Sequence, residues 1–267
     1  MKKVNKYLEY IEEQREMEYL LEGIDIDSFN KMVYFNDDHE KNINTSIYTN
    51  PTISHIKDIK VISIFKRIRN DEKTDGNPLI YALKDIKGWK IDDANLEKLY
   101  NRFNQILEKI NDKYDTIILV PSSNILNTKI LHNIGKTIKY DHQITDYMQK
   151  MSADDVYDNY IDWKSLYTDF PNRNLKKIIN DSFLRMETEN DDIFSFKYIP
   201  TNYRSYITKT MDKNYSVIKY AEEINDKHIL ILDDTISSGN TISEMSEDII
   251  TTYIPKSITI LTLFSSL

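Results

Sequence analysis

Four short apolar runs along the chain are typical of strands. Residues 60–65 (KVISIF), 116–120 (TIILV), 228–232 (HILIL) and 257–264 (SITILTLF) are rich in β-branched and other apolar side chains. The run at 116–120 is continuous and ends at Pro121, as expected of a strand that is covered on both faces. Such strands belong to parallel sheets, so the pattern predicts an α/β protein.

Apolar residues at helical spacing lie between these runs. The clearest helix is predicted over residues 92–110, where Asp92 or Asp93 can cap the N-terminus. Further helices are predicted over residues 3–22, 79–85, 125–139 and 242–250. The last of them joins the strands at 228–232 and 257–264 into a βαβ unit, which crosses over right-handed into a parallel sheet. Shorter strands are predicted at 193–198 and 205–208.

The amino-acid composition excludes several classes of functional site. The 267 residues include no cysteine, which excludes disulfides, thiolate zinc sites, iron–sulfur clusters and cysteine nucleophiles. The net charge of −8 disfavours nucleic acid as a bulk ligand. The five histidines form no metal-ligand spacing, so a zinc hydrolase is not expected. No apolar run is long enough to span a bilayer and the first residues are too charged for a secretory signal, so we expect a cytoplasmic protein that does not engage membranes.

The segment 229–241 (ILILDDTISSGNT) carries the chemistry. Two acidic residues end a buried strand, at the sheet edge where open α/β sheets bind ligands. Hydroxyl and amide residues around a glycine follow them at the start of a helix, whose N-terminal amides favour phosphate. The carboxylates suit vicinal hydroxyls, which donate to them. A phosphate beside a diol describes a ribose 5-phosphate, although a plain capped strand–turn–helix joint has a similar composition.

This segment resembles the binding signature for phosphoribosyl diphosphate (PRPP) of the type I phosphoribosyltransferases. The resemblance implies that Asp233 and Asp234 contact the ribose hydroxyls. It also implies that the 5′-phosphate is held by a set of small residues after them. That set is Ser237, Ser238, Gly239, Asn240 and Thr241, with Thr235 standing where many members carry a branched aliphatic residue.

Other parts of the family's machinery match more loosely. Ser122, Ser123 and Asn124 follow the strand at 116–120, where the family holds pyrophosphate, and a plain polar turn is an equal alternative. Residues 208–215 are similar to the lysine-rich loop of the orotate branch, without its usual His-Gly ending. The implied catalytic cations are Lys209 and Lys213, with Arg204 as a further cation, against the alternative of a solvated charged loop.

The resemblance implies a doubly wound, mostly parallel sheet of the type I phosphoribosyltransferase kind. Residues 1–110 are then a helix-rich N-terminal region or hood with one core strand. Residues 111–267 are the phosphoribosyltransferase-like core, with a polar insertion at 140–190 that we interpret as helices and loops. The family is often dimeric, which leaves a homodimer or a partner protein open.

The implied function is a magnesium-dependent glycosyltransferase of nucleotide metabolism. It binds Mg–PRPP, transfers phosphoribose to a nitrogen of an unidentified base and releases pyrophosphate, with Mg²⁺ borne by the substrate and no direct metal ligand from the protein. A non-catalytic PRPP- or nucleotide-sensing module, regulatory or part of a defence system, is the main alternative, because the fold does not fix the function. A PRPP-forming pyrophosphokinase is a third, more distant one.

Overall fold

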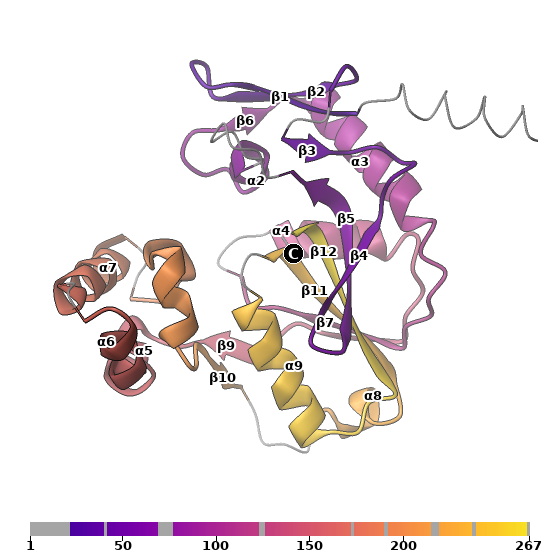
Figure 1. Ribbon diagram of the computed structural model, residues 1–267. Coiled ribbons are helices and arrows are strands. Elements are labelled where there is room, and N and C mark those ends of the chain that lie inside the picture. Colours follow the sequence, from indigo (N-terminus) through magenta and orange to yellow (C-terminus); the bar gives the residue numbers. More distant parts are fainter. Residues whose placement is uncertain are drawn as a thin grey trace, which may run out of the picture.

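The computed structural model describes residues 22–39, 42–68, 77–122, 126–171, 174–189, 192–214, 219–236 and 239–265. Its centre is a seven-stranded, mostly parallel sheet in the order β3-β5-β12-β11-β7-β8, with β4 also paired to β5 (Figure 1). The strands from β5 to β8 run parallel to their neighbours, and β3 and β4 run antiparallel to β5. The predicted α/β class and mostly parallel sheet are confirmed.

The four apolar runs form the middle of this sheet. They become β5 (Ile59–Arg67), β7 (Thr116–Leu119), β11 (His228–Ile236) and β12 (Ser257–Ser265). The helix α9 (Asn240–Thr252) connects β11 to β12, which lie side by side in parallel, as the βαβ prediction requires. Their central residues are fully buried because helices cover both faces of the sheet.

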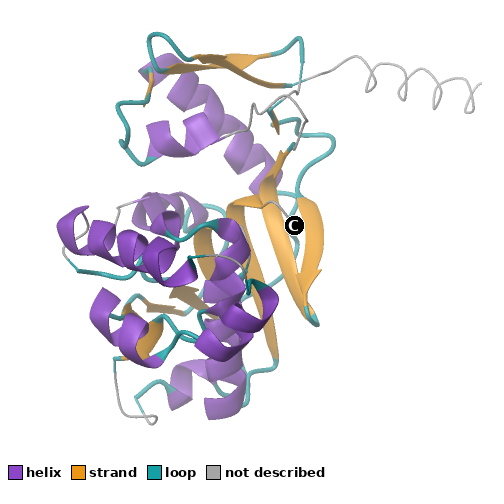
Figure 2. Cartoon of the chain, turned by 60° about the vertical axis from the view of Figure 1, so that its left-hand side comes forward, coloured by secondary structure: helices purple, strands orange, loops and turns teal. Residues whose placement is uncertain are grey.

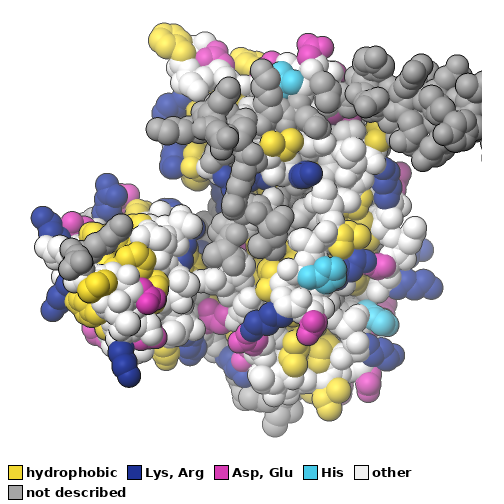
Figure 3. Space-filling model, viewed as in Figure 1, with side chains coloured by type: hydrophobic (Ala, Val, Ile, Leu, Met, Phe, Trp, Pro, Cys, Tyr) yellow, Lys and Arg dark blue, Asp and Glu magenta, His cyan; other side chains and the backbone are white. Residues whose placement is uncertain are grey.

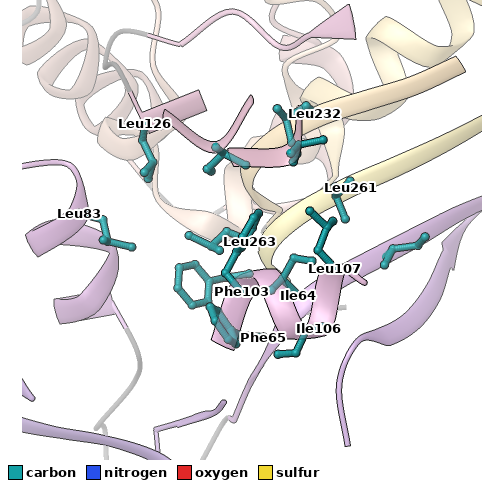
Figure 4. Packing of buried hydrophobic residues seen from close by; sticks show 14 of the residues in the cluster. Ile64, Phe65, Leu83, Phe103, Ile106, Leu107, Leu126, Leu232, Leu261 and Leu263 are labelled. Carbon is teal, nitrogen blue, oxygen red and sulfur yellow. The ribbon is translucent and has the colours of Figure 1, made fainter. Parts of the chain in front are cut away.

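Side chains on successive positions of β11 enter two different cores. Leu230 and Leu232 belong to a core that includes Ile64 of β5, Phe103 of α3 and apolar residues of α2 and α4. Figure 4 shows Leu232, Ile64 and Phe103 in this core. Ile229 and Ile231 point the opposite way, into a second core that includes Ile242, Met245 and Ile249 of α9. The helices of the first face are α2 (Asn77–Leu83), α3 (Asp93–Leu107) and α4 (Leu126–Ile134). The second face also carries α8 (Ala221–Ile224).

The described part of the N-terminal region, residues 22–110, contains more strand than we expected. A hairpin of β1 (Gly23–Asp27) and β2 (Met32–Asn36) joins β6 (Lys90–Ile91) in a small sheet, which lies at the end of the molecule away from the main sheet (Figure 2). The strands β3 (Ile43–Asn44) and β4 (Thr52–Ile56) add to the main sheet beside β5. The prediction of a helix-rich region with one core strand is therefore wrong for this part, and the helix predicted at 3–22 lies outside the described residues. Turn-rich polar stretches concealed the short strands, since a hairpin with one solvated face has few apolar residues.

Residues 151–210 form a helical lobe with a core of its own. Helices are present within the range 140–190 that the sequence predicts as an insertion, but two short strands occupy its start, at 142–144 and 148–150, and the lobe extends beyond its end. The chain leaves the body through β9 (Met148–Lys150), builds the lobe and returns through β10 (Met211–Lys213), which pairs antiparallel with β9 (Figure 1). The preceding edge strand is β8 (His142–Ile144). The lobe contains α5 (Ala153–Asn159), α6 (Trp163–Asp169), α7 (Leu175–Glu189) and the 3-10 helices η1 (Phe196–Tyr198) and η2 (Thr201–Tyr206).

The strands predicted at 193–198 and 205–208 are wrong. Both stretches belong to the lobe, where they contribute isolated bridges at Ile193 and Ile207 and otherwise form η1 and η2. Pro200, which has no N–H to donate to a ladder, caps η2. The aromatic residues between them pack into the lobe core and not onto a sheet face. None of the helices in the described ranges is long and apolar enough to cross a membrane.

Candidate functional site

The acidic pair lies inside β11 and not in the loop after it. The strand continues to Ile236, and Asp233 and Thr235 pair in register with Thr262 and Phe264 of β12. Because side chains alternate along a strand, Asp233 and Thr235 share one face and Asp234 points to the other. The sequence pattern places both acids correctly at the carboxyl end of the strand, and the longer strand separates their side chains.

A cavity of about 220 Å³ opens on the face that carries Asp233. It lies where the end of β11, the start of α9, the β9–β10 ribbon and η1 meet. Three lysines from three distant parts of the chain line it: Lys84, which follows α2, Lys150 of β9 and Lys197 of η1. Its other polar lining residues are Ser195, Thr210, Asp233, Thr235, Gly239, Asn240 and Thr241.

Lys84 connects the cavity with the acid on the opposite face of the strand. Its Nζ lies 2.8 Å from both carboxylate oxygens of Asp234, and the two side chains are 19% and 7% exposed. Asp234 itself does not line the cavity. Its carboxylate fixes the ammonium of Lys84 at the cavity wall, because an ion pair with so little solvent is held in one geometry.

The lysines and Asp233 influence one another electrostatically. Burial raises the pKa of Asp233 to about 7, and the neighbouring charge of Asp234 adds to the rise, while Lys84 and Lys150 oppose it. Burial lowers the pKa of Lys150, and the positive charges of Lys84 and Lys197 act in the same direction. A cavity that gathers three ammonium groups of like charge stabilises an anion that enters it.

The start of α9, where the sequence predicts a phosphate-binding turn, lies at the cavity. Gly239 caps the helix in the left-handed region, with φ of 77°. A Cβ built there would lie 2.9 Å from Cδ1 of Ile56, so both the backbone angle and the neighbouring strand favour glycine. Asn240 donates from Nδ2 to the carbonyl of Arg204 at 3.1 Å. Ser237 and Ser238 lie outside the described residues.

Thr235 lines the cavity and carries a polar atom without a partner among the described residues. Its Oγ1 is buried and has no hydrogen-bond partner among the described residues. A buried hydroxyl without a partner costs free energy, and a ligand oxygen in the cavity would remove that cost. The sequence pattern treats Thr235 as a substitute for an aliphatic residue, whereas in the structure its hydroxyl is available to a ligand as a hydrogen-bonding group.

We expect Gly239→Ala to destabilise the protein by about 1–2 kcal/mol, because alanine is strained at a positive φ. Adding Ile56→Val, which removes Cδ1, should recover only the part due to that contact. Gly135→Ala, at a glycine outside the left-handed region, is the matched control and should cost less. Urea unfolding measures all four proteins. Equal losses for Gly239→Ala and Gly135→Ala would contradict the role of the backbone angle.

The predicted catalytic cations do not reach this cavity. Lys209 pairs with Asp212, and Lys213 lies 2.8 Å from Asp248 of α9. Both line a groove of about 1050 Å³ between α9 and the helical lobe, where charged side chains of both signs lie at the surface (Figure 3). This groove adjoins the cavity at Asp233, with which it shares lining residues such as Thr210 and Asn240, but neither lysine lines that cavity. Arg204 donates from Nε to the carbonyl of Ile199, and burial lowers its pKa. These contacts favour a structural role for the three residues in this conformation.

The loop after β7 lines another cavity, of about 490 Å³. Ser122 is among its lining residues, together with Asn127 and Thr128 of α4. Ser123 and Asn124 of the predicted pyrophosphate loop lie outside the described residues. Lys150 lines this cavity as well as the one at Asp233. In the described ranges, no three His, Asp or Glu side chains lie close enough together to hold a metal ion.

Sequence reasoning missed Lys84, Lys150 and Lys197. Lys84 and Asp234 are 150 positions apart in the sequence, so no local sequence pattern predicts that they form an ion pair. Lys150 lies in a three-residue strand that is too short to produce an alternating pattern. No protein-family model matches the chain, and no curated protein matches it.

Proposed function

We propose that the cavity at Asp233 binds the ribose 5-phosphate part of PRPP, and that the protein transfers phosphoribose to a nitrogen nucleophile. The observation that carries the proposal is the convergence of three lysines, one carboxylate and a glycine-capped helix N-terminus on one small cavity. Lysines and backbone amides suit a phosphate, and the carboxylate suits sugar hydroxyls.

The size of the cavity supports a small ligand. Pockets for drug-sized molecules have volumes of roughly 300–1,000 Å³, so the cavity of about 220 Å³ suits a sugar phosphate and not a whole dinucleotide. In this proposal, the carboxylate of Asp233 accepts hydrogen bonds from the ribose hydroxyls. Asp234 acts through Lys84, which it holds at the cavity wall. This assignment differs from direct contact of both acids with the ribose, because Asp234 does not line the cavity.

Little protein chemistry is needed for the transfer itself. The reaction at the ribose C1 passes through a state with positive charge on the sugar, so positioning and neutralisation of the leaving group contribute most. Mg²⁺ enters as part of the substrate, carried on phosphate oxygens. The carboxylate of Asp233 beside the sugar favours the developing positive charge.

Calorimetric titration with PRPP, with and without Mg²⁺, tests the proposal. We expect Mg-dependent binding in the micromolar range, about −8 kcal/mol. Absence of binding would overturn it. Release of diphosphate with a panel of nitrogen bases then separates a transferase from a non-catalytic sensor. Lys209 and Lys213 form ion pairs with Asp212 and Asp248 and do not line the cavity, which favours the sensor as the second candidate.

Thr235→Val provides a sharper test of the same cavity. Valine keeps the shape and removes Oγ1, so PRPP affinity should fall about 3–10-fold while the unliganded protein stays as stable or gains up to about 1 kcal/mol. Titration and urea unfolding measure the two effects. Thr251→Val is the control, because the Thr251 hydroxyl bonds to the carbonyl of Glu247 within α9, outside the cavity. Unchanged affinity in Thr235→Val would remove this hydroxyl from the site.

A further inference from the structure

Lys150 occupies the junction of two cavities. Of the described residues, it is the one that lines both the cavity at Asp233 and the cavity after β7. The first suits the sugar phosphate, and the second is lined by hydroxyl and amide groups of Ser122, Asn127 and Thr128. Asn127 is buried, and its Oδ1 has no partner among the described residues. The second cavity thus adjoins the first at Lys150 and is lined by further polar residues.

The ammonium of Lys150 also differs from the other cations near the site. Lys84 is bound by Asp234, Lys209 by Asp212 and Lys213 by Asp248. No carboxylate among the described residues forms an ion pair with Lys150, although the charge of Asp233 acts on it. A lysine that is largely removed from water and has no carboxylate partner gains more from an arriving anion than a paired one does.

Glu244 fixes the ribbon that carries Lys150. Its carboxylate, on α9, accepts hydrogen bonds from the backbone N–H groups of Thr210 and Met211 and from the Thr210 hydroxyl, at 2.9–3.1 Å. Met211 is the register partner of Lys150 in the β9–β10 ribbon. A carboxylate that accepts several charge-assisted bonds in a half-buried place holds its donors firmly. Glu244 therefore links α9, which begins after Gly239 at the cavity, to the strand of Lys150.

We propose that Lys150 binds the diphosphate leaving group of PRPP, and that Glu244 is the positioning residue that holds Lys150 in place through β10. This inference rests on the proposed function. In the transfer, the acceptor nitrogen forms a bond to the ribose C1, and the bond from C1 to the diphosphate oxygen breaks. The electron pair leaves with the diphosphate, whose charge Lys150 neutralises while it keeps its own proton. The proton on the acceptor nitrogen is released to water.

Inorganic diphosphate with Mg²⁺ is the probe, titrated by calorimetry into the full chain. Lys150→Met should weaken its binding about 10–100-fold, and Lys150→Arg should restore it to within about threefold of the wild type. Glu244→Gln keeps one acceptor oxygen and should weaken binding about 3–10-fold. Glu247→Gln removes the same charge one turn further along α9, where Glu247 pairs with Lys57, and should leave the affinity unchanged.

The double variant separates positioning from general damage. If Glu244 acts through Lys150, then Lys150→Met with Glu244→Gln binds diphosphate no more weakly than Lys150→Met alone, whereas independent effects would add. Additive losses would overturn the role of Glu244. Wild-type binding of PRPP, combined with unchanged diphosphate affinity in Lys150→Met, would overturn the inference and leave the proposed function standing. A wild-type protein that binds neither PRPP nor diphosphate would overturn both.

Discussion

Asp233→Asn is expected to weaken PRPP binding more than about 100-fold and, at the same time, to make the unliganded protein more stable at about pH 8. The loss of affinity follows because asparagine removes the charged acceptor for the ribose hydroxyls. The gain in stability follows from the raised pKa of Asp233, which burial and Asp234 bring to about 7. At about pH 8 the folded protein must keep Asp233 ionised in a buried place, which lowers the stability of the unliganded protein. A ligand whose hydroxyls donate to the carboxylate offsets this loss.

The sign of the pH dependence follows from the same shift. In the unfolded chain Asp233 loses its proton near its ordinary pKa of 3.8, and in the folded protein it keeps the proton to about pH 7. The folded state therefore binds more protons between these values, and stability falls as the pH rises through this window. The full cost is present above the folded pKa and amounts to about 2–4 kcal/mol.

Urea unfolding at about pH 5 and about pH 8 measures this difference. At about pH 5 the folded side chain is largely neutral but the unfolded one is already mostly ionised, so Asp233→Asn should be only modestly more stable than the wild type. At about pH 8 the folded side chain is ionised as well, so the stability advantage of the variant should be larger. Asp212→Asn, which removes a surface carboxylate that pairs with Lys209, is the control and should show no such increase with pH. A variant that is destabilised equally at both pH values would refute the assignment of the shifted group.

The elements that the sequence predicts well are those with a complete local pattern. The apolar runs at β5, β7, β11 and β12 are long enough to show that both faces are covered. The helix α3 begins where its N-cap predicts, because the side chain of Asp92 accepts from the N–H of Asn95. The short strands of residues 22–56 and the 3-10 helices of the lobe lack such patterns, and tertiary contacts determine them.

The candidate site divides in the same way. Asp233, Thr235 and Gly239 are adjacent in sequence and come together in one cavity, as the segment predicts. The lysines that line the cavity are far from this segment in the sequence. A lysine side chain is long, so its ammonium group can reach the cavity from any element that passes nearby. Lys209 is closer to the segment in the sequence, yet it forms an ion pair with Asp212, three residues away, and does not line the cavity. Nothing in the sequence distinguishes Lys84 from any other lysine near the end of a helix.

Lys84→Met should destabilise the protein by about 3–5 kcal/mol, because it leaves the Asp234 carboxyl buried without its counter-charge. The methionine fills much of the space of the lysine stem, so little of the loss comes from packing. Adding Asp234→Asn should recover most of the stability, since the double variant replaces the ion pair by a neutral pair. Urea unfolding of the wild type, the two single variants and the double variant gives the coupling energy directly.

Lys197→Met is the matched control, because Lys197 lines the same cavity on an exposed side chain. Its stability should change by less than about 0.5 kcal/mol. The double variant with Lys84→Met and Asp234→Asn should remain folded yet bind PRPP weakly, because the cavity wall has lost a fixed ammonium. That combination would separate the two roles of the pair, a structural one between α2 and β11 and a binding one at the cavity. If the double variant is as unstable as Lys84→Met alone, the cost lies in packing around the lysine stem and not in the uncompensated carboxylate.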